Sequence, residues 1–255
     1  MANKKKVIPL PVITLLVCIV LFFIPFPAIA VDIMIALYLI MTIAILLAAI
    51  FRKDGIFSSF PVLSLIASIY GLGVYVISAR LITVEGAAFD SWIIQAVSAF
   101  VAGTGEILHL IVGASLFYVG MTILVVVITR GSMSMSEMTA KFIQETLPER
   151  LAAAEKIAGS ESIKTKRDLR RKADFLEAVY GAVKFLIGEV KVRRFLIMVI
   201  LLGGTAIDFF LRGAELIDAA KACVSLSLGS GTIFLIPALL QSFAATCVFN
   251  RTLKR

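Results

Sequence analysis

Long apolar runs, each almost free of charged residues, constrain this chain more than any other feature of its sequence. A helix needs about 20 residues to cross a hydrocarbon core of about 30 Å. The runs predicted to span are residues 10–24, 28–51, 60–84, 107–129, 195–211 and 232–249, of which the first is short and would draw on residues 7–9 as well. The chain is 60% apolar and only 16% charged, whereas about a quarter of the residues carry charge in a soluble domain. The sequence therefore predicts an all-α, polytopic integral membrane protein with about six transmembrane helices.

One long polar segment, residues 130–194, separates the fourth span from the fifth. It is rich in Ala, Glu, Lys, Arg and Leu, which favour helix, and it holds more than half of the Lys and Arg residues. An apolar stripe of Phe175, Val179, Val183 and Leu186 follows the helical repeat, and we expect this helix to lie against the membrane or a neighbouring subunit. The predicted domains are an N-terminal membrane region of four spans (1–129), a basic helical cytoplasmic loop (130–194) and a C-terminal membrane region of two spans (195–255).

The distribution of positive charge predicts an orientation in the membrane. Lys and Arg residues close to span ends are retained on the cytoplasmic side. With the N-terminus inside, nearly all of the 25 Lys and Arg residues lie in cytoplasmic segments, and only Arg80, Arg212 and Lys221 lie outside. The net charge of +8 therefore indicates topology and not nucleic-acid binding, which would need a basic face with aromatics that stack on bases. We expect both termini and the long loop in the cytoplasm.

The residues of catalytic and metal sites are sparse. Cys18, Cys223 and Cys247 lie far apart, and the chain has a single His, so neither a disulfide framework nor a zinc site is indicated. The sequence contains no intramembrane Ser–His pair, no His-Glu-x-x-His helix and no Gly-rich phosphate loop. We therefore predict a protein that is not an enzyme, with no catalytic residue, metal or cofactor.

Four ionisable residues lie in or near the predicted spans and are candidates for a proton relay: Asp32, Glu106, His109 and Asp208. An ionisable side chain at membrane depth is costly and usually faces the bundle interior or water. Each has a plainer alternative. Asp32 is placed to complement the start of its own helix, Glu106 and His109 are spaced as a solvated surface pair, and Asp208 is spaced to pair with Arg212.

Motifs in the same order along nearly the whole chain resemble the FHIPEP family, the export-gate proteins of flagellar and injectisome type III secretion. Outside the loop, the resemblance rests on Phe60-Pro61, Ala79-Arg80-Leu81-Ile82, Gly229-Ser230-Gly231 and Ile236-Pro237-Ala238-Leu239-Leu240. Within the loop, it rests on Arg130, Gly131, Lys141, Phe142, Pro148, Asp174, Phe175, Gly181, Lys184, Phe185 and Gly188.

The resemblance implies a component of the bacterial inner membrane that forms a homo-oligomeric ring with other export-apparatus membrane proteins. It also implies a role in secretion of protein substrates driven by the proton motive force. The sequence departs from the family pattern at Tyr180 and Ser230, where the pattern has acids, and at Gly71 and Tyr75, where it has Arg and Asn. The family's soluble C-terminal domain is expected to be absent. Two alternatives stay open: an independent small ion-coupled transporter or channel, and a truncated, inactive structural remnant of an export gate.

Overall fold

The computed structural model describes residues 26–52, 57–103, 107–156 and 160–254, and nearly all of them are helical, without a strand. The expected all-α fold is confirmed. The α-helices are α2 (Ala28–Phe51), α3 (Phe60–Glu85), α4 (Trp92–Ala102), α5 (Ile107–Lys141), α6 (Leu147–Glu155), α7 (Ser160–Val199), α8 (Thr205–Phe210) and α9 (Leu216–Lys254). The remaining elements are the 3-10 turn η1 (Gly86–Ala88) and the π-helical turns η2 (Phe142–Thr146) and η3 (Ile200–Gly204).

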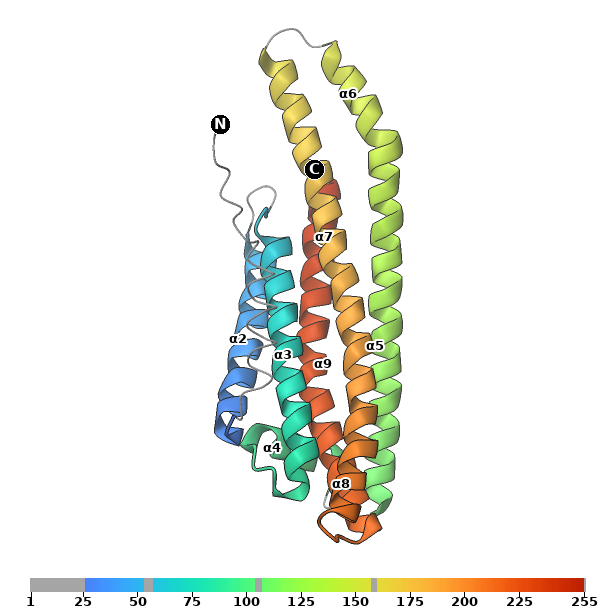
Figure 1. Ribbon diagram of the computed structural model, residues 1–255. Coiled ribbons are helices and arrows are strands. Elements are labelled where there is room, and N and C mark those ends of the chain that lie inside the picture. Colours follow the sequence, from blue (N-terminus) through green and yellow to red (C-terminus); the bar gives the residue numbers. More distant parts are fainter. Residues whose placement is uncertain (1–25, 53–56, 104–106, 157–159, 255) are drawn as a thin grey trace, which may run out of the picture.

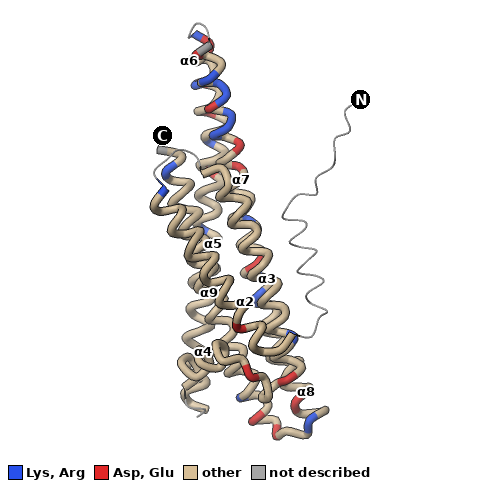
Figure 2. The backbone as a smooth tube through the Cα atoms, turned by 90° about the vertical axis from the view of Figure 1, so that its left-hand side faces the viewer, with Lys and Arg blue, Asp and Glu red and all other residues tan. Residues whose placement is uncertain are grey.

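The long helices form an elongated bundle in which α9 contacts α2, α3, α4, α5 and α7 (Figure 1). The short helices α4 and α8 close one end of the bundle. At the other end α5, α6 and the first part of α7 project beyond the rest as a helical arm. Lys and Arg residues gather on this arm, and few charges lie along the middle of the bundle (Figure 2). The bundle therefore has an apolar middle and a basic projecting end.

Four described helical segments are long and apolar enough to cross a membrane: Ala28–Phe51, Phe60–Ala88, Ile107–Glu155 and Leu216–Leu253. They contain the second, third, fourth and sixth predicted spans. The first predicted span, residues 10–24, lies outside the described residues, and the fifth, residues 195–211, falls on the end of α7, η3 and α8. Ile33, Leu37 and Ile40 expose an apolar face of α2, as expected for a helix surrounded by lipid. These features define a polytopic helical membrane protein.

The predicted loop at residues 130–194 has no break at either of its boundaries. Helix α5 continues through Thr129 and Arg130, and α7 continues through Arg194 and Phe195. The segment forms part of the arm at its start and part of the bundle at its end. We expected its apolar stripe to lie against the membrane or a neighbouring subunit, and this was wrong. Other helices of the same chain bury the stripe: Phe175, Val179 and Val183 pack in one cluster with Phe60, Ala245 and Phe249.

Helix α9 runs without interruption through Gly229-Ser230-Gly231, although two glycines in three residues commonly weaken a helix. The glycines serve close packing instead. A Cβ atom at Gly229 would overlap the Ile94 carbonyl and Ser98 of α4, and one at Gly231 would overlap the Phe117 ring of α5. Membrane helices associate through such small residues because lipid supplies no hydrophobic driving force between them.

Candidate functional site

An ion pair lies in the interior of the bundle, between Glu189 and Arg193 of α7. The two residues are one helical turn apart, so their side chains meet on one face. Their side chains are 0% and 4% exposed, and an Arg193 Nη atom bonds Glu189 Oε1. A charge removed from water is strongly unfavourable without a partner. The pairing is therefore what makes both residues tolerable at this position.

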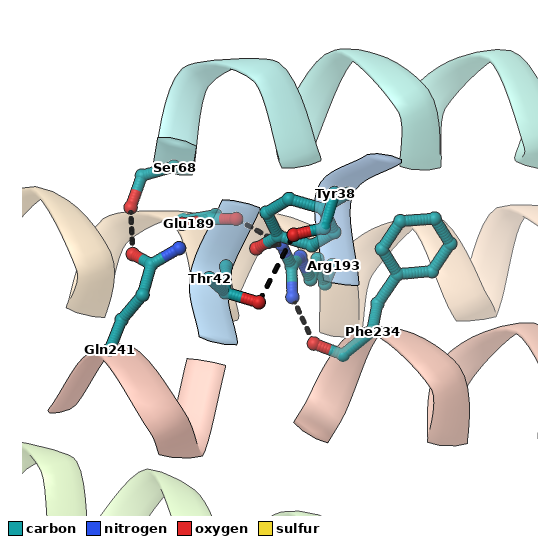
Figure 3. Close-up of polar contacts among 7 residues, drawn as sticks. All are labelled: Tyr38, Thr42, Ser68, Glu189, Arg193, Phe234 and Gln241. Carbon is teal, nitrogen blue, oxygen red and sulfur yellow. Dashed lines mark hydrogen bonds and ion pairs between the residues drawn. The ribbon is translucent and has the colours of Figure 1, made fainter. Parts of the chain in front are cut away.

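Arg193 also binds residues of two other helices, α2 and α9 (Figure 3). Its guanidinium donates to the hydroxyl of Tyr38 in α2, at 3.0 Å, and to the main-chain carbonyl of Phe234 in α9. The rings of Tyr38, Tyr75 and Phe234 surround it, with centroids 5.8, 5.9 and 5.4 Å from its Cζ atom. Aromatic faces attract a cation, especially away from water. A single side chain thus connects α2, α3, α7 and α9.

Other buried polar groups lie beside the ion pair, and several of their atoms have no hydrogen-bond partner among the described residues. Ser68 of α3 donates to Oε1 of Gln241 in α9, at 2.8 Å. Glu189 Oε2, Arg193 Nε, Gln241 Nε2 and the Tyr75 hydroxyl are buried and have no hydrogen-bond partner among the described residues. An unpaired buried polar atom costs free energy. The site therefore combines an ion pair with spare donors and one spare carboxylate oxygen.

The depth of the site follows from its partners. Tyr38 lies near the middle of α2, and Tyr75 lies well inside α3, so Arg193 is level with the middle of two predicted spans. Gly71 of α3 makes room for the Tyr38 ring, which a Cβ atom there would overlap. The two positions in α3 that depart from the family pattern therefore lie at this site: Gly71 is next to Tyr38, and Tyr75 is next to Arg193. Glu189 and Arg193 were not among the predicted site residues, because they fall within the segment predicted to be a cytoplasmic loop.

Asp208, one of the four predicted residues, lies at the end of the bundle where α8 meets η1. It is buried and pairs with Arg212, which was the alternative to a proton site. A Cβ atom at Gly86, whose φ is +56°, would overlap both side chains. Cys223 of α9 places its Sγ 3.7 Å from Asp208 Oδ2. The contacts join η1, α8 and α9, and a proton-carrying role for Asp208 stays a prediction.

Asp32 caps a helix, but that helix is α4 and not its own. Its carboxylate accepts from the Ser91 hydroxyl at 2.5 Å and from the main-chain N–H groups of Trp92 and Ile93 at 3.0 and 3.3 Å. Acidic groups at a helix start satisfy free N–H groups and the helix dipole. Glu106 lies outside the described residues, and His109 is exposed in the first turn of α5.

The residues of the loop motif divide between the core and the surface. Phe142 and Phe175 are buried in one cluster, and Gly131 and Phe185 are partly buried. The exposed members are Arg130, Lys141, Pro148, Asp174, Gly181, Lys184 and Gly188. Lys172 lies over the Phe142 ring, with its Nζ 5.3 Å from the centroid. Burial lowers the pKa of this amine, and the charge of Arg150 lowers it further.

Apolar helices, a buried ion pair at mid-span and a basic arm define a polytopic membrane protein with an interior ionisable site. Comparison with known proteins is more specific. The chain matches the FHIPEP family over residues 18–255, and it belongs to that family. No solved structure matches.

Curated relatives from flagellar and invasion systems resemble nearly the whole chain. The flagellar biosynthesis protein FlhA of Borreliella burgdorferi is 31% identical over 92% of this chain and 35% of that protein. FlhA of Salmonella typhimurium is 28% identical over 98% of this chain and 37% of that protein. The invasion protein InvA of the same organism is 29% identical over 98% and 37%. The chain therefore spans about a third of the length of these relatives.

Proposed function

We propose that this chain is an inner-membrane component of a type III protein export apparatus, of flagellar or injectisome kind, and that it resembles an export gate. The observation that supports this most directly is the family match over residues 18–255, together with relatives named as flagellar biosynthesis and invasion proteins. Its partners would be other membrane proteins of the apparatus, further copies in a ring, the lipid bilayer and the exported proteins. It would act without catalysis or a cofactor.

The proton motive force would act on Glu189. A carboxylate at membrane depth is rare and costly, and such groups commonly mark proton or ion pathways. Protonation of Glu189 would remove the charge that Arg193 pairs with, so Arg193 would shift its bonding toward Tyr38 and Phe234. Helix α7 would then move relative to α2 and α9. Tyr180 and Ser230 suit this role less, because neither residue carries a carboxyl group at a position where the family pattern has an acid.

The same proposal places the arm of α5, α6 and α7 in the cytoplasm. Positive charge near span ends is retained inside, and Lys and Arg residues gather on the arm. A topology reporter inserted within residues 160–166 should report cytoplasm, and reporters after Glu85 or Ala214 should report the opposite side. An outside signal from the arm would contradict this orientation.

A chimera tests the export function. Residues 18–255 would replace the matching third of Salmonella typhimurium FlhA, with the remainder of that protein retained, in a strain that lacks its own copy. We expect the chimera to insert in the inner membrane, co-purify with export-apparatus proteins and restore measurable secretion of flagellar protein into the medium.

The controls are wild-type FlhA and the empty strain, with membrane levels compared by blotting. A chimera that reaches the wild-type level in the membrane but neither co-purifies nor secretes would count against the proposal. Such a result would favour the independent transporter or the inactive remnant.

A further inference from the structure

A cleft opens on the side of the bundle between α5, α7 and α9, three helices that pack against one another (Figure 1). Its volume is about 590 Å³, and its walls are mostly apolar, with Phe117, Met121 and Ile197 among them. Two exposed side chains with polar ends complete the lining, Arg194 of α7 and Tyr118 of α5. The Arg194 guanidinium donates to the Tyr118 hydroxyl at 3.3 Å, and its Cζ atom lies 5.7 Å from the centre of that ring. The cleft is therefore an apolar hollow with one cation beside it.

Arg194 lies near the middle of the membrane. It follows Arg193, which bonds Tyr38 in the middle of α2. Its own partner, Tyr118, is the central residue of the apolar run 107–129. Because the hydrocarbon core is about 30 Å thick, lipid phosphates lie about 15 Å away on either side. A side chain held at Tyr118 does not reach them, so a lipid headgroup does not supply its anion.

Apolar side chains surround this cation on α7. Phe195, Met198 and Leu202 are all exposed along the same helix, and Lys191, about one turn before Arg194, is a second exposed cation. A charge at membrane depth is costly and normally faces water or a partner group. So many exposed apolar side chains do not suit a water-filled space, and a hydrocarbon tail in the cleft would leave the cation without an anion. The surroundings indicate a contact with protein.

A second copy of this chain does not offer a free carboxylate at this depth. The predicted spans contain only two acids, Asp32 and Asp208, and the structure adds Glu189 at mid-depth. Glu189 and Asp208 are each paired with an arginine one turn further along, and Asp32 caps α4. The anion that Arg194 requires therefore has to come from a different protein.

We propose that the cleft between α5, α7 and α9 binds a transmembrane helix of a different membrane protein, and that this helix carries Asp or Glu near its middle. The carboxylate would accept from Arg194, and a large apolar side chain about one turn away would occupy the cleft. A helix without the acid would leave the cation buried and unpaired, which is strongly unfavourable. Charge would thus select the partner and fix its depth. That the partner belongs to the export apparatus rests on the proposed function.

Site-specific cross-linking tests the contact in the chimera with Salmonella typhimurium FlhA. The photoreactive residue p-benzoylphenylalanine would replace Met198, which lines the cleft. In a matched control it would replace Ile33, which is exposed on α2 and lies about as far from Tyr38 toward the same end of the bundle. After irradiation of cells, we expect the Met198 position to join one membrane protein, within a transmembrane segment that has Asp or Glu near its middle. The Ile33 position should give at least about tenfold less of this product, because lipid covers that face.

Charge reversal tests the chemistry of the contact. Arg194→Glu should lower the yield of the product at least about tenfold, because two carboxylates would then face each other. Changing the partner's acid to Arg should restore the product in the Arg194→Glu background and lower it in the parent chimera. Arg194→Lys keeps the charge and should retain much of the yield. Thr122, on the α5 side of the cleft, is the second labelling position, should the label at Met198 lower the membrane level of the chimera.

Three products would overturn the proposal: one with a second copy, one with the retained part of FlhA, and one with a segment that has no acid near its middle. Absence of any product from both labelling positions would do the same. Secretion is measured separately, so a chimera that secretes but gives one of these results would keep its export function. A product that depends on charge but joins a protein outside the export apparatus would support the contact and refute the proposed function.

Discussion

Arg193→Ala is expected to destabilise the bundle by about 3–5 kcal/mol, because removal of one partner leaves a buried charge unpaired. The variant would leave Glu189 without its cation and would also remove the bonds to the Tyr38 hydroxyl and the Phe234 carbonyl. A typical domain is stable by only about 5–15 kcal/mol, so this loss would remove a large share of the folding free energy and lower the unfolding midpoint clearly. The measurement is thermal or denaturant unfolding of purified protein in detergent, followed by circular dichroism.

Arg194→Ala is the matched control. Arg194 is adjacent in sequence but exposed, and loss of its contact with Tyr118 should cost under about 1 kcal/mol. A double change, Glu189→Leu with Arg193→Leu, should recover most of the lost stability, because buried ion pairs can often be replaced by apolar groups at little cost. Equal stability of Arg193→Ala and Arg194→Ala would show that the buried pair does not stabilise the fold.

Loss of the Glu189 carboxylate should abolish export while the protein remains in the membrane. In the chimera with Salmonella typhimurium FlhA, we expect Glu189→Gln to lower secretion by at least about tenfold, since an amide cannot take up and release the proton that an intramembrane relay requires. Secreted flagellar protein in the culture medium is the measured quantity, normalised to the membrane level of each variant.

Two comparisons separate the chemistry of Glu189 from its contribution to stability. Glu189→Asp keeps an ionisable group and should retain part of the secretion. The double Leu variant should be folded but should not export, because it keeps the packing and removes the carboxylate. Normal secretion from the folded double variant would contradict a coupling role for Glu189.

The helical membrane fold could be predicted from the sequence because lipid imposes a local requirement. Backbone polar groups must be paired within a segment, so each span is a long apolar helix that is visible in composition alone. The runs at 28–51, 60–84, 107–129 and 232–249 all fall within described helices that can span a membrane. The Asp208 to Arg212 pair was foreseen for a similar reason, since both residues lie within one helical turn.

Contacts between segments far apart in the chain could not be predicted from local sequence patterns. Asp32 has the expected spacing for capping its own helix, yet it caps α4, about sixty residues further along the chain. Gly229 and Gly231 are of the residue type that often interrupts a helix, but α9 continues through them. Because they have no side chains, α9 can approach α4 and α5 closely. Which neighbour occupies the space around a small or acidic residue depends on how the helices pack.

The charged end of the 130–194 segment shows most clearly which features the sequence predicts and which depend on helix packing. Composition alone indicated a cytoplasmic surface there, because Glu189, Lys191, Arg193 and Arg194 lie close together. Sequence by itself determined that these residues are helical and that 189 and 193 share a face. Only the tertiary structure decided that this face is turned toward Tyr38 and Phe234 at mid-span. The physical reason is that the depth of a charge depends on whether other helices supply partners for it, and those partners come from α2 and α9.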